Sequence, residues 1–220
     1  MLVGDHQQLP PVVRAENDLQ ASLFERLIQQ YPEASVMLDR QYRMAQRIQS
    51  FSSREFYDGA LRPATGAVAS QSLSDLGVDA GDLPATIRDR VNFVDPGGNR
   101  DGNVNAAEAQ RVAELVEDYV DAGVPREDIG VIAPFRAQVA EINRRTDEVT
   151  VDTVDRFQGS SEEVIVVSFI ATGDLDSPSF EDERRVNVAL TRAKKSLTLV
   201  GDAEALASEP FYARLPEWAR

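Results

Sequence analysis

The stretch RRVNVALTRAKK, residues 184–195, decides the fold and organises the rest of the chain. Its apolar residues recur one and three to four positions apart, which predicts an amphipathic helix with one buried stripe. Arg185 and Arg192 are seven residues apart, so we expect them near the same side of that helix, two turns from each other. The next segment, SLTLVGD (196–202), is a short apolar run that predicts a buried strand. Such a pair would hold a guanidinium rigidly; a surface helix with solvated charges is the alternative.

Length and composition exclude several classes of protein. The chain has 220 residues, enough for one sizeable core or for one core and a fragment of another. It has no cysteine and a single histidine, His6, so we expect neither a disulfide framework nor a metal site built from thiolates or histidines. No apolar run approaches the length of a membrane span, and no signal-peptide pattern follows Met1. We therefore expect a cytoplasmic protein without a membrane partner.

The charge is strongly acidic. The formal net charge is −14, and Lys194 and Lys195 are the only lysines. This argues against a globally basic nucleic-acid binder, but it leaves room for a locally basic groove. We also hypothesise that the chain belongs to an acidic proteome adapted to high salt; a protein that is most stable in dilute buffer would contradict this.

Strands and helices are expected to alternate along the chain. The pattern predicts strands at 35–39, 91–95, 129–133, 148–152, 163–170 and 196–202, and helices at 17–31, 45–57, 105–119 and 139–145. Several of these strands are apolar throughout, which favours a parallel sheet covered by helices on both faces. Ligands bind such sheets at the carboxyl ends of the strands. The segments 4–8, 41–43, 134–138 and 153–159 are expected at those ends.

Smaller features complete this outline. Asn105 and Glu108 form a capping-box pattern. Residues 153–159 predict a turn with a short helix, and the tail from Ala203 predicts short helices, with Trp218 packing back on the body. Residues 61–90 are rich in Ala, Gly, Ser and Asp, and we interpret them as a surface excursion, with a plain loop as the alternative. The opening looks like the end of a strand, so we expect a longer parent protein.

Four motifs in order resemble those of a known family. They are VGDHQQLPP (3–11), DRQYRM (39–44), VDTVDRFQG (151–159) and RRVNVALTRA (184–193). They resemble motifs III, IV, V and VI of superfamily 1 helicases, in the group that contains the nonsense-mediated-decay helicase and the Okazaki-fragment nuclease-helicase. The resemblance implies a RecA-like α/β fold of the P-loop NTPase type. It also implies that 1–33 end a first RecA-like domain and that 34–220 form the second.

The resemblance assigns catalytic roles to three residues. Arg192 takes the place of the arginine finger, Arg43 that of the motif IV arginine that reaches the γ-phosphate, and Gln8 that of the motif III glutamine that senses it. A guanidinium can hold two phosphate oxygens at once, which suits phosphoryl transfer. The alternatives are a salt bridge for Arg43 and a solvated loop position for Gln8.

The resemblance also implies binding residues. For the nucleotide they are Gly4, Asp5, Tyr42, Gln158, Gly159 and Arg185, and for the nucleic acid they are Thr153, Pro134, Phe135 and Gln138. Core packing is the alternative for both Tyr42 and Phe135. The family usually carries Gln-Gly-x-Glu in motif V, with the glutamate near the ribose. Here Ser161 stands at that position, so the ribose contact stays unassigned.

The chain carries no Gly-x-x-x-x-Gly-Lys-Ser/Thr phosphate loop and no Asp-Glu pair before Gly4. ATP and Mg²⁺ would therefore be shared with a first RecA-like domain outside this chain. We expect the C-terminal part of an ATP-dependent helicase that acts on single-stranded DNA or RNA. A non-catalytic module that binds nucleic acid or protein is the alternative, and a helicase-nuclease would carry its nuclease elsewhere.

Overall fold

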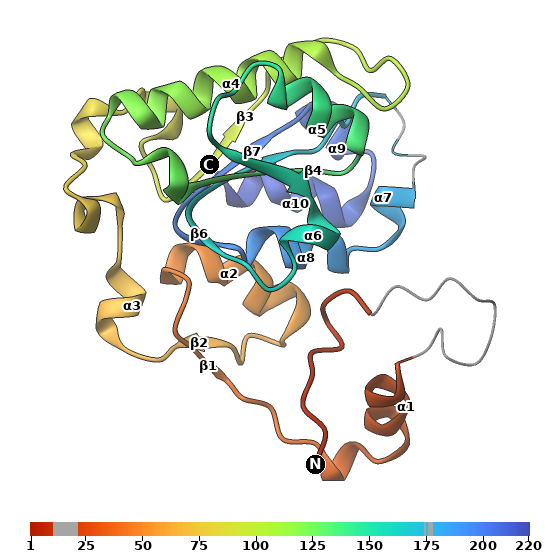
Figure 1. Cartoon of the computed structure of the whole chain (residues 1–220). Helices are drawn as coiled ribbons and strands as arrows, with labels where there is room; N and C mark the ends of the chain where they lie inside the picture. Colours follow the sequence, from red (N-terminus) through yellow and green to blue (C-terminus); the bar gives the residue numbers. More distant parts are fainter. Residues whose placement is uncertain (11–21, 174, 176–177) are drawn as a thin grey trace.

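The computed structural model describes residues 1–10, 22–173, 175 and 178–220 (Figure 1). The strands are β1 Arg40–Gln41, β2 Arg62–Pro63, β3 Val91–Val94, β4 Ile129–Ala133, β5 Thr150–Thr153, β6 Glu162–Ser168 and β7 Ala193–Val200. The α-helices are α1 Leu23–Gln30, α2 Gln46–Phe56, α3 Gly66–Ser70, α4 Ala106–Asp121, α5 Arg136–Asn143, α6 Val154–Phe157, α7 Pro178–Glu181, α8 Arg184–Leu190, α9 Ala203–Leu206 and α10 Pro210–Trp218. Short 3-10 helices are η1 Pro32–Ala34, η2 Leu73–Leu76, η3 Ala80–Asp82, η4 Ala85–Ile87 and η5 Arg126–Asp128.

The main sheet has five strands in the order β3-β7-β6-β4-β5, and every pair in it is parallel. Helices α4 and α5 lie on one side of the sheet, and α2 and α8 lie on the other (Figure 1). This confirms the predicted parallel sheet with helices on both faces. Parallel strands need crossovers, so the alternation of strand and helix in the sequence dictates this layered arrangement.

Each face of the sheet carries its own hydrophobic core. In β6, Val164 and Val166 pack with α4 and α5, whereas Ile165 and Val167 pack with α2, α6, α8 and α10. Successive side chains of a strand point to opposite faces, so a strand buried on both sides must be apolar at every position. That is why the continuous run in β6 could be recognised as a central strand.

Two predicted elements at the beginning of the chain differ from the structure. Residues 35–39 form no strand, and Val36 and Leu38 are 86% and 79% exposed. Only β1 finds a partner, β2, with which it forms a separate two-stranded parallel sheet. Strand pairing requires a hydrogen-bonding neighbour, which apolar alternation alone does not supply. Of the helix predicted at 17–31, the described part runs from Leu23 to Gln30, and 17–21 lie outside the described residues.

The helix predicted from residue 184 is shorter than expected. Helix α8 ends at Leu190, and Ala193 already belongs to β7, where it pairs with Glu162 of β6. The Thr191 hydroxyl donates to the Asn187 carbonyl at 2.8 Å and closes the last turn. Arg192 therefore lies between helix and strand, and the prediction that it shares a helix side with Arg185 is wrong. Sheet pairing overrides the helical periodicity at this junction.

The excursion at 61–90 is attached to the body through a row of apolar side chains. Leu73, Val78, Leu83 and Ile87 are buried at 8%, 2%, 2% and 0% exposure, and they belong to the same core as the inner face of α4. Leu73 lies in η2 and Ile87 in η4, and η3 lies between Val78 and Leu83. The segment has no long periodicity because each turn buries only one or two residues.

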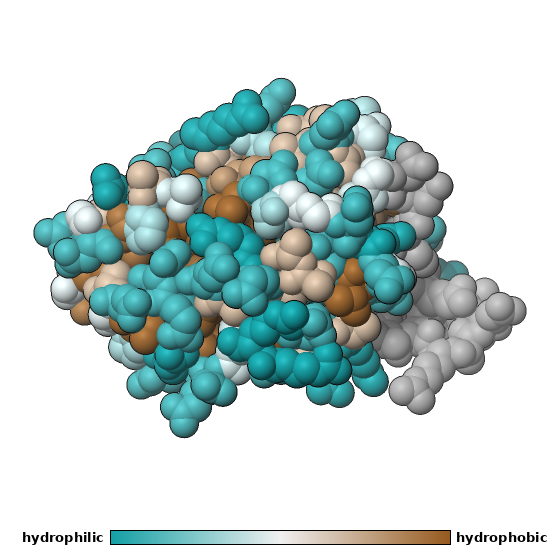
Figure 2. Space-filling model, turned by 90° about the horizontal axis from the view of Figure 1, so that it is seen from above, coloured by the Kyte–Doolittle hydropathy of each residue, from teal (hydrophilic) through white to brown (hydrophobic). Residues whose placement is uncertain are grey.

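The tail packs back as predicted. The Trp218 ring lies 5.1 Å from the Phe51 ring of α2, and its Nε1 donates to the Ser50 hydroxyl at 2.9 Å. The Arg47 guanidinium lies 5.2 Å from the centre of the same Trp218 ring. The tail thus closes the core under α2. The face seen from above is mainly hydrophilic, with apolar patches between the polar side chains (Figure 2). Within the described ranges, no helix is long and apolar enough to cross a membrane.

Gly130 of β4 is a position where a side chain would disturb the core. A Cβ there would lie 2.8 Å from Ile165 Cδ1 and 3.0 Å from Phe157 Cε1. We expect Gly130→Ala to lower the free energy of unfolding by about 1–3 kcal/mol, because the overpacked core must shift. Gly66→Ala is the matched control, since nothing lies within 4 Å of its Cβ position. Urea unfolding of the two variants checks this, and equal stabilities would contradict it.

Candidate functional site

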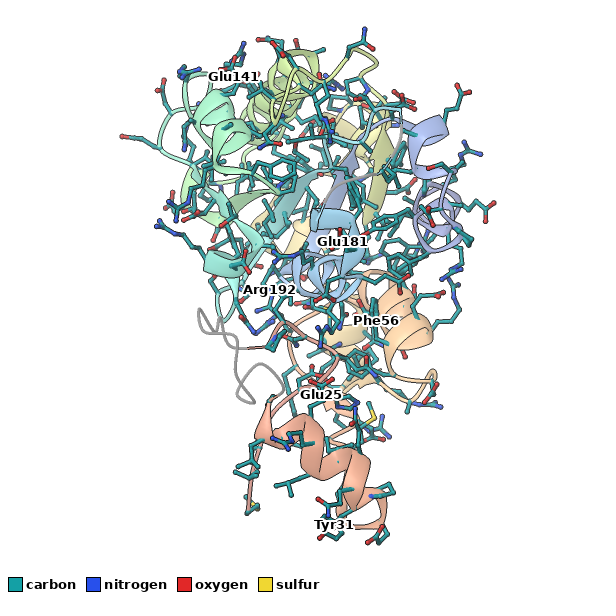
Figure 3. The ribbon with its side chains drawn as sticks, turned by 90° about the vertical axis from the view of Figure 1, so that its right-hand side faces the viewer. Glu25, Tyr31, Phe56, Glu141, Glu181 and Arg192 are labelled. Atoms are coloured by element: carbon teal, nitrogen blue, oxygen red, sulfur yellow. The ribbon has the colours of Figure 1, made fainter. Side chains whose placement is uncertain are left out.

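Arg192 lies at the amino end of β7, buried to 2% exposure. Its guanidinium donates to the Val188 carbonyl at 2.9 Å, the Ser160 carbonyl at 3.2 Å and the Thr191 hydroxyl at 2.9 Å. Burial, and next the neighbouring charge of Arg43, lower the pKa of the Arg192 guanidinium to about 10. The group therefore remains charged at neutral pH. Its hydrogen bonds hold it at the position labelled in Figure 3.

Arg43 approaches the same point from the turn before α2. Its Nη1 donates to the Thr191 carbonyl at 2.9 Å. The Gln41 Oε1 accepts from the amide groups of Arg43 and Met44 at 2.8 Å and 2.7 Å, so the turn is fixed by its own side chain. Burial lowers the pKa of Arg43 as well. Within the described residues, neither Arg43 nor Arg192 forms an ion pair with a carboxylate.

Gln8 completes this group of predicted catalytic residues. The Arg192 Nη2 donates to Gln8 Oε1 at 3.4 Å, and Gln8 Nε2 donates to Asp5 Oδ2 at 2.8 Å. The next residue, Leu9, is buried in the core at 8% exposure, and its carbonyl accepts from Gln158 Nε2 at 3.1 Å. The structure thus brings Gln8, Arg43 and Arg192 together, with Asp5 and Gln158 beside them.

Tyr57, which the sequence analysis did not single out, links the two halves of this cluster. Its hydroxyl donates to Asp5 Oδ2 at 2.7 Å and accepts from Asn187 Nδ2 of α8 at 3.0 Å. Asn187 Nδ2 also donates to the Gln7 carbonyl at 2.8 Å. Burial, and then the Asp5 carboxylate, raise the pKa of Tyr57, which therefore stays a proton donor at neutral pH. A tyrosine at a helix end before Asp-Gly carries no sequence signal for this role.

Tyr57→Phe should loosen the segment 1–9. The variant keeps the ring but loses both hydrogen bonds of the hydroxyl, worth about 1 kcal/mol each at most in a partly exposed site. The chain lacks cysteine, so Leu2→Cys gives one site for a spin label whose line width reports the mobility of the segment. We expect a narrower line in Tyr57→Phe. Tyr31→Phe, an exposed tyrosine on the same part of the chain, is the control; identical spectra in both variants would contradict the role of Tyr57.

The predicted nucleic-acid residues lie at the other end of the parallel strands, which is the carboxyl end. Pro134 and Phe135 follow the carboxyl end of β4, and Thr153 ends β5; all three are half-buried. Arg136 beside them is exposed, and its side chain has no partner among the described residues. The prediction that all motif segments gather at the carboxyl ends is therefore wrong. Arg192 lies at the amino end of β7 because this strand begins at Ala193. Gln158 lies before the amino end of β6 because the chain returns there from the carboxyl end of β5 through α6.

Gln138 does not face solvent, contrary to its predicted contact with nucleic acid. Its side chain is fully buried. It accepts from the Asn105 amide at 3.0 Å and donates to the Asn105 carbonyl and the Ser168 hydroxyl, both at 3.2 Å. Gln138 therefore fastens α5 to α4 and β6. The sequence placed it only one helical turn from the surface turn at Pro134, and helical rotation turns it inward.

Glu108 departs from the predicted capping box. Asn105 does cap α4, with its side chain accepting from the Glu108 amide at 3.1 Å. The Glu108 carboxyl group instead points into the protein, where its Oε1 accepts from the Ser168 hydroxyl at 2.6 Å and from the Ile170 amide at 2.9 Å. Its Oε2 is buried without a partner among the described residues. Burial raises the pKa of Glu108 to about 7.

The remaining predicted nucleotide residues are spread more widely. Arg185 Nη1 forms an ion pair with Asp155 Oδ2 at 3.0 Å. The Arg185 residue also lines a cavity of about 50 Å³ beside Pro134, so it lies toward the carboxyl ends of the strands, away from Arg192. Tyr42 is 76% exposed, which excludes core packing for it. Gly159 adopts a φ of +98°, which favours glycine. Gly4 is exposed, with Phe24 packed 3.2 Å from its Cβ position.

The guanidinium groups of Arg43 and Arg192 and the Gln8 amide thus gather at the amino end of β7 in a parallel α/β sheet. Within the described part of the chain, no group of three or more His, Cys, Asp or Glu side chains could hold a metal ion. Residues 19–204 match the family described as AAA domain, and the chain belongs to this family of superfamily 1 helicases.

Characterised and uncharacterised helicases resemble the chain over nearly its whole length. An uncharacterized ATP-dependent helicase of Methanocaldococcus jannaschii is 37% identical and aligns with 100% of this chain and 34% of its own length. The DNA polymerase alpha-associated DNA helicase A of Saccharomyces cerevisiae is 33% identical over 94% of this chain and 34% of its own. The human DNA replication ATP-dependent helicase/nuclease is 34% identical over 96% of this chain and 23% of its own. The chain thus spans about a third or less of these relatives.

Proposed function

We propose that this chain is the C-terminal part of an ATP-dependent superfamily 1 helicase or translocase. In this proposal, residues 1–33 end the first RecA-like domain and 34–220 form the second. The observation that carries the proposal is the cluster of Gln8, Arg43 and Arg192: two guanidinium groups and an amide converge without a carboxylate partner for either arginine among the described residues. An anion bound between these two positive charges would relieve their repulsion.

The donor set fits the terminal phosphate of a nucleotide. When bound, ATP would supply the phosphoryl group, and Mg²⁺ would supply positive charge beside the phosphate oxygens. A first RecA-like domain would hold the metal and the other phosphates. Arg192 would exchange its weakest contact, the 3.4 Å bond to Gln8, for phosphate oxygens. Its Nε stays on the Val188 carbonyl, which keeps the planar fork aimed. Preorganised positive charge of this kind stabilises the transition state of phosphoryl transfer.

Gln8 is suited to report the state of that phosphate. Its amide lies between Arg192 and Asp5, and Asp5 is bound through Tyr57 to Asn187 of α8. A change in what Arg192 holds therefore reaches the segment 5–9 and helix α2 through a continuous chain of hydrogen bonds. This is the physical route by which nucleotide state would move one domain against the other.

The carboxyl ends of the β-strands supply the surface along which single-stranded nucleic acid would bind. Phe135 offers a half-buried ring on which a base could stack, and Arg136 offers an exposed cation for a phosphate. We expect Phe135→Ala to weaken binding of an oligothymidine by about 1–3 kcal/mol. Phe56→Ala, which removes a half-buried ring from the far side of the sheet, is the control. Fluorescence anisotropy measures both, and equal affinities would contradict the stacking role.

Turnover tests the proposed division of labour. We expect the chain alone to show no ATP hydrolysis above background. Joined behind a first RecA-like domain that carries a phosphate loop, it should hydrolyse ATP, and single-stranded nucleic acid should accelerate this. If the joined protein binds a single strand but shows no turnover, the chain is a binding module instead of half of a motor.

A further inference from the structure

A groove of about 630 Å³ lies between helix α2, the small β1–β2 sheet and the start of α3. These elements sit together below the main sheet, on the side toward α3 (Figure 1). None of the residues that the helicase motifs assign to the nucleotide or the nucleic acid lines it. The groove therefore has no part in the site described above.

The groove is basic on an acidic protein. Arg40, Arg54 and Arg62 line it, and no aspartate or glutamate does so among the described residues. The whole chain carries 37 acidic and 23 basic side chains, so its net charge is negative. The charged side chains that line this groove are arginines, so its local charge has the opposite sign. A concentration of one sign of charge in a concave surface focuses the field and favours a ligand of opposite charge.

The backbone fixes two of these arginines side by side. Arg40 and Arg62 are in register in the parallel pair β1–β2, which the Arg62 amide strengthens by donating to the Asp39 carbonyl at 2.8 Å. Like charges at paired positions destabilise a sheet. Arg62 has no side-chain partner within the described residues, and the nearest carboxylate to Arg40 is Asp39 Oδ1 at 3.8 Å. The pairing leaves unneutralised charge that an anion would balance.

Hydrogen bonds between lining residues tie the two sides of the groove together. Gln49 Nε2 and Ser53 Oγ of α2 both donate to the Leu61 carbonyl at 2.8 Å, immediately before Arg62. Arg54 of α2 faces the same space and is 58% exposed, with its Nε on Glu55 Oε1 at 2.7 Å. The arginines thus project from elements that are tied together, so little order has to be gained when a ligand binds.

We infer that this groove binds phosphate groups of a single-stranded nucleic acid, at a place that includes Arg40 of motif IV but none of the residues assigned to the nucleotide or the nucleic acid. Arginine forks match phosphate oxygens in pairs. Within the described residues, no aromatic side chain lines the groove, so it can grip a backbone but cannot stack a base. It therefore contributes affinity that is independent of sequence.

Salt-dependent binding of the whole chain tests this inference. The probes are a fluorescein-labelled oligothymidine and, in a separate arm, inorganic pyrophosphate as the phosphate of a free nucleotide. For Arg40→Gln/Arg62→Gln we expect weaker oligothymidine binding and a log–log salt slope that is smaller by about 1.4, or about 0.7 for each phosphate that the variant no longer neutralises. The charge-matched control is Arg111→Gln/Arg144→Gln, which removes two partly exposed arginines from α4 and the end of α5.

The outcomes separate this inference from the proposed helicase function. Relief of repulsion should leave the melting temperature of Arg40→Gln/Arg62→Gln at or above that of the unaltered chain, so weaker binding will not reflect unfolding. Equal slopes in the two double variants, or no oligothymidine binding by the unaltered chain at low salt, would overturn the inference. Tighter binding of pyrophosphate than of oligothymidine would also overturn it, in favour of a free nucleotide. None of the residues assigned to the nucleotide or the nucleic acid is altered in these variants, so turnover of the joined protein is tested separately.

Discussion

Arg192→Lys is expected to slow ATP turnover about 10³-fold or more in a protein that joins this chain to a phosphate-loop domain, if Arg192 acts as the proposed arginine finger. Lysine keeps the positive charge but replaces a planar fork of donors with a single ammonium group. The guanidinium holds the Val188 and Ser160 carbonyls while it faces Gln8. An ammonium cannot serve all three, so it either leaves its position or fails to reach the phosphate.

The control for Arg192→Lys is Arg144→Lys, an exposed arginine that pairs with Glu141. It should turn over ATP at the unaltered rate. Because Arg192 is buried, circular dichroism melts of both variants must accompany the rates, and we expect Arg192→Lys to melt as a folded protein. A folded Arg192→Lys variant within tenfold of the unaltered rate would show that no fork is needed at this position.

Glu108→Gln is expected to remove a pH dependence of stability of about 3 kcal/mol, since each unit of pKa shift is worth about 1.4 kcal/mol. The pKa of Glu108 is raised from 4.5 to about 7 in the folded protein. Between these values the folded state binds more protons than the unfolded state. The free energy of unfolding contributed by Glu108 is therefore complete below pH 4.5 and is lost as the pH rises through 7.

Urea unfolding at a series of pH values from 4.5 to 8 measures this. Glutamine stays neutral, and its Oε1 can still accept from the Ser168 hydroxyl and the Ile170 amide, so the decline with pH should flatten. Its Nε2 would replace an Oε2 that already lacks a partner in the described part of the chain, so absolute stability at low pH should fall. Glu114→Gln, an exposed position on the same helix, is the control. Equal pH profiles for both variants would contradict a carboxyl group that is neutral when folded.

The central layout was predictable because it depends on patterns that the backbone enforces locally. Apolar runs such as 163–170 identify buried parallel strands, and the resemblance to helicase motifs singled out Arg192, Arg43 and Gln8, which the structure brings together. Where the prediction failed, tertiary pairing decided the result. The strand β7 begins at Ala193 because Glu162 pairs with it, and this ends the helix before Arg192.

The sequence did not reveal at which end of the strands each motif residue lies, or which polar side chains are buried. The motif residues divide between the two ends of the parallel strands, because the chain returns through α6 from the carboxyl end of β5 to the amino end of β6. Gln138 and Glu108 point inward, although both residue types are usually exposed. Gln138 accepts a hydrogen bond from the Asn105 amide, and Glu108 accepts one from the Ser168 hydroxyl. Tyr57 joins Asp5 to Asn187 over separations of 52 and 130 residues, beyond the reach of any local pattern.

A crystal structure of the joined protein with ADP and aluminium fluoride, which mimics the transferring phosphate, would locate the donors themselves. We expect the guanidinium groups of Arg192 and Arg43 and the Gln8 amide within hydrogen-bonding distance of the fluoride ligands. Arg192 should keep its Nε on the Val188 carbonyl while it releases Gln8 Oε1. A structure in which these side chains keep their present partners, and other residues surround the fluoride, would contradict the assignment of this chain as the arginine-bearing half of a motor.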